Sequence, residues 1–171
     1  MPAVPEHLDG HLLGLYLGDH LAGAAGGINR FERLAKTWDD RPFGKDFAML
    51  ATEVGEEARL LRETIDLLGV APRRPRQLAA MLGERAARLV AHGRPFQRSP
   101  MGLLLEIEVM RGAVMAKRGL WQTLSDLSDD LDLPGDAYDT LVERSDEQVQ
   151  VLDRVHAEVR TRAFRVPPAR R

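Results

Sequence analysis

Apolar residues recur every three or four positions along four long stretches of the chain, the spacing of one face of an α-helix. These stretches cover about residues 8–36, 44–68, 100–130 and 136–164, and a shorter one covers about 76–91. Ser99-Pro100 is typical of a helix start, with serine as N-cap and proline in the first turn, and Gly69 is typical of a helix end. The pattern predicts an all-α protein.

The lengths of the connections predict how the helices are arranged. The turns after the first and third long helices are short, so each of these pairs should be antiparallel. About thirty residues separate the second and third long helices, enough to return along the bundle and to include the short helix. We expect a four-helix bundle with one long crossover; the alternative, an up-down array of five helices, fits the short third helix less well. Residues 1–171 should form one domain, with a core over about 8–164 and a flexible tail at 165–171.

Composition limits the chemistry. The 171 residues include no cysteine, which excludes disulfides, thiolate metal sites and cysteine nucleophiles. The net charge of -2 does not favour nucleic acid as a partner. The first ten residues lack the basic region of a signal peptide, and no apolar run reaches the ~20 residues of a membrane span. We therefore expect a cytoplasmic protein that does not bind a membrane.

Several ionisable residues fall on or beside the apolar faces when each helix is drawn as a wheel at 100° per residue. From the first to the last long helix they are Asp19, His20 and Arg30; Glu57 with Glu53 further out; Glu106 and Lys117; and His156 with Asp153 at the edge. Buried charges are costly unless they are paired. These residues should therefore meet one another inside the bundle.

The helix directions predict two polar layers. Asp19, His20, Glu57 and Lys117 should lie at the same height and form a middle layer. Arg30, Glu106 and His156 should form a second layer near one end. Each layer would then combine carboxylate, cation and imidazole groups, as buried charges require.

The expected topology and the inward acids resemble the ferritin-like superfamily. Its di-iron members use a carboxylate from each of two helices and Glu-x-x-His from each of the other two. Asp153-Arg154-Val155-His156 resembles one such motif, whereas Glu53-Val54-Gly55-Glu56 lacks the histidine. By this resemblance Glu106 would be the third helix's ligand, and Asp19 or His20 the first helix's. The resemblance implies an iron or manganese site with oxidase, oxygenase or iron-handling activity.

Lys117 points to a different interpretation, because an ammonium facing Glu57 would take the charge role of a divalent cation. We therefore expect a non-catalytic bundle with a degenerate metal site and no cofactor, acting as a homodimer or through a protein partner. The alternatives are a di-iron or manganese carboxylate protein, a single-metal site of His20, Glu53 and Glu57, and a small-molecule binder with a polar cavity around Asp19, His20 and Glu57.

Glycines are unusually frequent in the first helix. Gly14, Gly18, Gly23, Gly26 and Gly27 each weaken a helix by ~1 kcal/mol relative to alanine. They predict a close crossing with another helix; the alternatives are a dimer interface or a place where the backbone makes room for a ligand.

Overall fold

The computed structural model describes residues 4–70 and 99–165, which form four long helices and one short helix. The elements are α1 (Gly10–Thr37), α2 (Pro42–Leu68), α4 (Pro100–Asp126), α5 (Ser128–Leu131) and α6 (Gly135–Arg160). Neither described range contains a strand. The prediction of an all-α helical bundle is confirmed.

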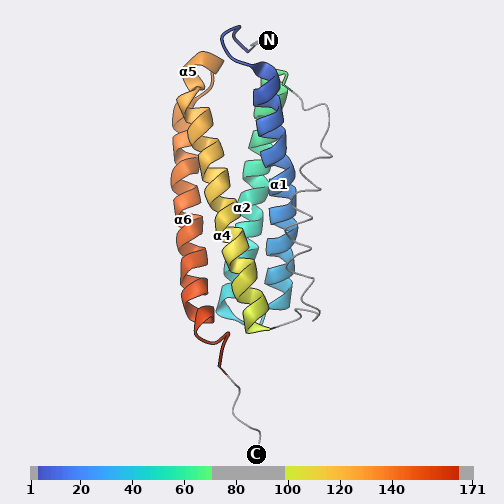
Figure 1. Cartoon of the computed structure of the whole chain (residues 1–171), viewed down its shortest axis with the longest axis vertical. Coiled ribbons are helices and arrows are strands. Elements are labelled where there is room, and N and C mark those ends of the chain that lie inside the picture. The colour runs from blue at the N-terminus through green and yellow to red at the C-terminus, as the bar shows by residue number, and fades with distance from the viewer. Residues whose placement is uncertain (1–3, 71–98, 166–171) are drawn as a thin grey trace, which may run out of the picture.

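The four long helices lie side by side as two antiparallel hairpins (Figure 1). α1 pairs with α2, and α4 pairs with α6, with α5 in the turn between α4 and α6. The two hairpins touch each other much less, mainly where α1 meets α4 and where α2 meets α6. α2 and α4 run in the same direction, so the end of α2 and the start of α4 lie at opposite ends of the bundle.

Local sequence accounts for the helix ends. The Asp9 carboxylate accepts hydrogen bonds from the backbone N–H groups of His11 and Leu12, at 2.9 and 3.0 Å, and so caps α1. The Ser99 hydroxyl accepts a 2.9 Å bond from the Gly102 N–H, and Pro100 occupies the first helical position of α4. Gly69 ends α2 with a φ of 66°, which glycine adopts without strain.

The core consists of two hydrophobic clusters, one toward each end of the bundle. The Trp38 cluster includes Phe31, Phe43 and Phe47, and the Trp121 cluster includes Leu61, Leu124 and Tyr138. The boundary between the clusters crosses every long helix. It lies between Leu21 and Ala24, Val54 and Leu61, Val114 and Leu120, and Val142 and Val149.

Some sequence predictions were wrong in detail. Leu12, Leu15 and Val109 belong to the apolar stretches from which the helices were predicted and were expected to face inward, but they are 61%, 38% and 39% exposed. α1 packs chiefly on α2, and α4 chiefly on α6, so each neighbour covers only part of a broad apolar face. The last helix ends at Arg160 rather than near 164, although Ala163 beyond its end still packs against the Trp38 cluster.

The third long helix does not run unbroken to residue 130. It ends at Asp126, and α5 begins after Leu127, whose φ and ψ of -96° and 4° depart from helix geometry. The predicted crossover helix at about 76–91 and residues 166–171 of the predicted tail lie outside the described residues. Among the helices in 4–70 and 99–165, none has the length and hydropathy needed to cross a membrane.

Candidate functional site: a buried ion network beside a cavity

A buried network of four polar side chains lies at the boundary between the two hydrophobic clusters. The Lys117 ammonium of α4 donates to the Glu57 carboxylate of α2 and to Gln148 Oε1 of α6, the latter at 2.5 Å. The Gln148 amide nitrogen donates to Glu57 and to Glu53, both at 2.9 Å. The network therefore joins three of the four long helices through side-chain hydrogen bonds.

Burial sets the electrostatics of this network. The Glu57 side chain is 1% exposed and that of Lys117 is 12% exposed. Burial lowers the pKa of the Lys117 ammonium below its ordinary 10.5, while Glu57 and, more weakly, Glu53 act in the opposite direction. Two carboxylates thus surround a single ammonium and a single amide. Loss of any one partner would leave a charged group in an apolar core without full compensation.

Helix geometry explains how these side chains converge. Glu53 and Glu57 are four residues apart, so they lie on the same side of α2. Ser145 and Gln148 are three residues apart on α6 and fall within its buried stripe. The Ser145 hydroxyl donates to the Leu141 carbonyl at 2.8 Å and is thereby satisfied within its own helix, whereas Gln148 reaches across to α2 and α4.

Sequence reasoning missed Gln148 and Ser145. Both occupy the apolar stripe that includes Leu141 and Leu152, and each is fully or almost fully buried. A search for ionisable residues on the wheels passes over an amide and a hydroxyl. Both residues are found when every polar residue on an apolar stripe is considered, whether or not it is charged, because a buried polar group needs a hydrogen-bond partner.

Asp19 and His20 were expected in the same layer as Glu57 and Lys117. The structure brings Glu57 and Lys117 together, but gives neither Asp19 nor His20 a hydrogen bond to them within the described residues. His20 is half-buried with its ring edge-on to Tyr16, the ring centroids 4.7 Å apart. Burial lowers the pKa of His20 from 6.5, with the Asp19 carboxylate opposing that effect.

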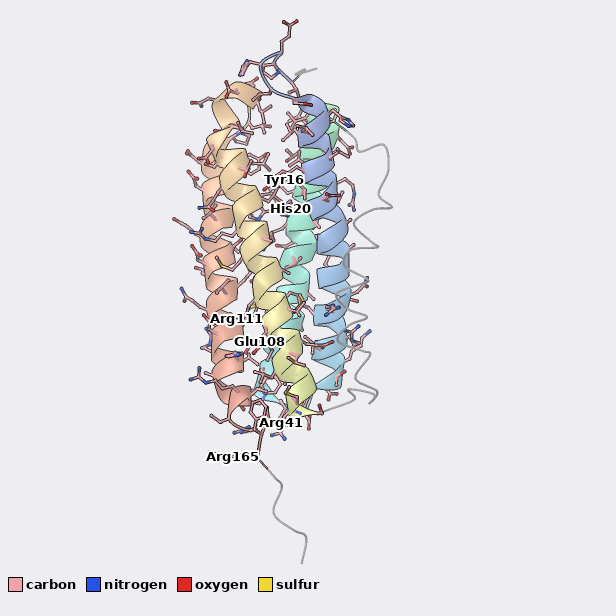
Figure 2. The ribbon with its side chains drawn as sticks, viewed as in Figure 1. Tyr16, His20, Arg41, Glu108, Arg111 and Arg165 are labelled. Atoms are coloured by element: carbon pink, nitrogen blue, oxygen red, sulfur yellow. The ribbon has the colours of Figure 1, made fainter. Side chains whose placement is uncertain are left out.

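Asp19, His20 and Lys117 instead meet at a cavity of about 400 Å³ between α1 and α4. Its walls are mostly apolar or small: Gly23, Ala24, Gly27 and Phe31 from α1, Val54 from α2, and Met110, Ala113, Val114 and Ala116 from α4. Tyr16 also lines the cavity, and its hydroxyl lies 3.3 Å from the Thr123 hydroxyl of α4. Figure 2 shows Tyr16 and His20 beside α4 in the upper half of the bundle.

The glycines of α1 divide into two groups at this cavity. A Cβ on Gly14 would lie 2.3 Å from the Val70 carbonyl oxygen, so this glycine does permit a close approach. A Cβ on Gly23 would meet nothing within 4 Å, and one on Gly27 would meet only Met110 Cε at 3.8 Å. Gly14 therefore permits a close approach to the chain just after α2 rather than the expected crossing with another helix, and the expectation is wrong at Gly23 and Gly27, where a Cβ would meet no atom closer than 3.8 Å.

The second predicted layer does not form as expected. Glu106 pairs with Arg33 at 2.9 Å rather than with Arg30, and His156 contacts Glu108 at 3.3 Å rather than Glu106. Arg33 lies almost one turn beyond Arg30 on α1, so a long guanidinium side chain from either could have reached Glu106. The layer is replaced by separate surface pairs, and Figure 2 places Glu108 on the lower half of α4.

The candidate metal ligands do not converge. They are His20, Glu53, Glu57, Glu106, Asp153 and His156. Asp153 is bound by Arg111 at 2.5 Å, and Glu57 by Lys117. Within 4–70 and 99–165, no three His, Asp or Glu side chains are grouped so that they could hold a metal ion. A divalent cation at Glu57 would have to displace the ammonium that already balances its charge, so the residues present do not fit a di-iron or manganese centre.

Comparisons of the chain with protein-family models, with curated proteins and with solved structures find no match. The function must therefore be inferred from the geometry of the buried network and of the cavity beside it.

Proposed function

We propose that this chain is a non-catalytic, ferritin-like bundle with a degenerate metal site, and that it acts by binding a second copy of itself or another protein. The directions of the helices support the ferritin-like assignment. α1–α2 and α4–α6 form antiparallel hairpins while α2 and α4 run parallel, which is the arrangement that one long crossover between α2 and α4 produces. The degenerate part is supported by the network at the bundle centre.

The observation that carries the proposal is the position of Lys117. Di-iron bundles surround a pair of cations with inward carboxylates at mid-bundle. Here two carboxylates, Glu53 and Glu57, are supplied with an ammonium and an amide in place of a metal. Lys117 thus pairs with Glu57, and the Gln148 amide donates to both carboxylates, so side chains take the place that a metal ion would occupy.

Metal analysis tests this part. We expect protein purified without chelator, then dialysed after incubation with iron(II) or manganese(II), to retain far less than one metal ion per chain. The double variant Glu106→Ala/His156→Ala should behave like the natural sequence. Stoichiometric metal that disappears in this double variant would contradict the proposal, because it would show that the resemblance-derived ligands bind metal.

Light scattering tests self-association. We expect a particle of twice the 19.1 kDa chain mass, stable to dilution. A dimer interface would also cover exposed apolar side chains such as Leu12, Leu67 and Met115, each of which is 49% or more exposed. A monomer at all concentrations would refute self-association and leave a different protein as the partner.

A second candidate function is small-molecule binding, and the cavity between α1 and α4 favours it. Ligand sites are typically concave, about 300–1,000 Å³ in volume, and apolar with a few polar groups. The cavity of about 400 Å³ meets these criteria, with Asp19, His20, Tyr16 and Lys117 as its polar members. This candidate requires no catalytic group and is compatible with a non-catalytic bundle.

A further inference from the structure

We propose that the cavity between α1 and α4 binds a small organic cation, an amine with an apolar body, whose ammonium group pairs with Asp19. This inference rests on the small-molecule function proposed above and names the ligand class. The volume of about 400 Å³ has room for roughly a dozen non-hydrogen atoms, at the ~30 Å³ that a water molecule occupies in the liquid.

Backbone composition keeps this space open. Gly23 and Gly27 face the cavity from α1, opposite Ala113 and Ala116 of α4. Alanine at Gly23 would meet no neighbouring atom and would raise helix propensity by ~1 kcal/mol, so packing does not demand glycine there. The exposed residues Asp19, Ala113 and Ala116 on its lining give the cavity access to solvent.

The charges around the cavity favour a cation. Asp19 lines it, and no residue in the described ranges forms a hydrogen bond or ion pair with the Asp19 carboxylate. The positive charge of Lys117 is balanced by Glu57. Lys117 is the only lysine or arginine among the described residues that line the cavity, so an anionic ligand would find this cation already paired and would face the Asp19 carboxylate.

The remaining polar and aromatic groups suit an alkylammonium. Burial keeps His20 neutral near pH 7, and a neutral imidazole can accept a hydrogen bond through one ring nitrogen. Tyr16 and Phe31 present aromatic rings to the cavity, and such rings attract cations when they lie within about 6 Å. Phe31, Val54, Met110 and Val114 supply the apolar surface for the rest of the molecule.

Calorimetric titration with three matched probes tests the proposal: 4-phenylbutylamine, 4-phenylbutyric acid and 4-phenylbutanol. They share one apolar body and differ in the charge of the head group. At pH 7 we expect the amine to bind about fivefold more tightly than the acid or the alcohol, because an ion pair with the exposed Asp19 carboxylate would add up to ~1 kcal/mol. In Asp19→Asn, the amine and the alcohol should bind within about threefold of each other, because the charge preference is lost.

Two further variants locate the binding site. Gly23→Leu fills the cavity and should abolish amine binding, while Gly26→Leu, on the exposed side of the same helix, should leave it unchanged. Thermal melting would show that both variants are folded, and heteronuclear NMR of the natural sequence would show amine-induced shifts at Gly23 and Ala113.

The outcomes distinguish the preference for a cationic ligand from the broader small-molecule function. Equal or tighter binding of the acid or the alcohol would overturn the cation assignment and leave the small-molecule function standing. Amine binding that persists in folded Gly23→Leu would overturn the site. No saturable binding of any of the three probes up to their solubility limits would overturn both the inference and the small-molecule function.

Discussion

Separating Lys117 from Glu57 gives the sharpest test of the buried network. Lys117→Met leaves two carboxylates, Glu53 and Glu57, sharing the single amide nitrogen of Gln148. Glu57→Leu leaves an ammonium that still donates to Gln148 Oε1 and still lies near Glu53. The double variant Glu57→Leu/Lys117→Met removes both charges and leaves Gln148 bonded to Glu53.

The expected magnitudes follow from burial. Removing one partner of a buried ion pair costs about 3–5 kcal/mol. Glu57 is 1% exposed, so Lys117→Met should fall near the upper end of that range; the 12% exposure of Lys117 places Glu57→Leu near the lower end. At this chain length 1 kcal/mol corresponds to a Tm change of roughly 2–4 °C, so the single variants should melt at least about 6 °C lower. The double variant should recover most of this loss, because apolar replacements of a buried pair are often neutral.

Urea denaturation of the four proteins across pH measures both the coupling and its cause. In Glu57→Leu the pKa of Lys117 should fall further below 10.5, since the carboxylate that raises it is gone. The unfolded chain then binds more protons than the folded chain below pH 10.5, so stability should rise with pH in that window. Lys117→Met removes this ammonium, so the rise of stability with pH in that window should be absent from that variant. Tyr138, whose pKa is raised from 10.0 by burial, is present in all four proteins and cancels in the comparison.

Additivity would refute this reasoning. If the free-energy losses of the two single variants sum to that of the double variant within about 0.5 kcal/mol, Lys117 and Glu57 are not coupled. Equal pH dependence of the two single variants would likewise show that neither leaves a stranded charge.

Three further predictions concern α1 and the helix ends. Gly14→Ala should lower the free energy of unfolding by about 2 kcal/mol or more, since its Cβ would lie 2.3 Å from the Val70 carbonyl oxygen. Gly26→Ala has open space around it and should raise the free energy of unfolding by up to ~1 kcal/mol. Thermal melts that rank the two variants the other way would exclude the close approach at Gly14. Burial lowers the pKa of His20, so below pH 6.5 the unfolded chain binds more protons than the folded chain and stability falls on acidification. His20→Asn should reduce this loss of stability. An unchanged pH profile would contradict the buried neutral imidazole. Ser99→Ala should cost ~1 kcal/mol by removing the cap of α4, measured by urea denaturation, and a loss below about 0.3 kcal/mol would show that this cap contributes little.

Much of the fold could be predicted from the sequence because strong local signals mark its elements. The Ser99-Pro100 start and the Gly69 end are set by backbone chemistry that depends on a few neighbouring residues. The contact between Glu57 and Lys117 also followed from wheel angles and helix direction, which place both residues inward and at the same height.

The parts that could not be predicted depend on how far a neighbouring helix extends over a face. A wheel gives the angle of Leu12 but not the area that α2 covers, so its exposure was missed. Arg30 and Arg33 differ by almost a turn and carry equally long side chains, so the choice of partner for Glu106 depends on side-chain packing. The cavity between α1 and α4 is likewise a property of helix spacing, which no single helix encodes.

The position of the network between two apolar clusters fixes the axial register of the helices. A slide of α4 by one turn, about 5.4 Å, would keep its apolar stripe facing inward and would change little in the burial of leucine and valine. It would, however, move Lys117 away from Gln148 and carry its ammonium along α2, either toward Glu53, one turn before Glu57, or toward Leu61, one turn after it. Hydrophobic packing alone tolerates several such registers, whereas only the observed one lets Lys117 bond Glu57 and Gln148 together. Lys117 also lines the cavity between α1 and α4, so the residue that sets the register of α4 against α2 and α6 is at the same time part of the cavity wall.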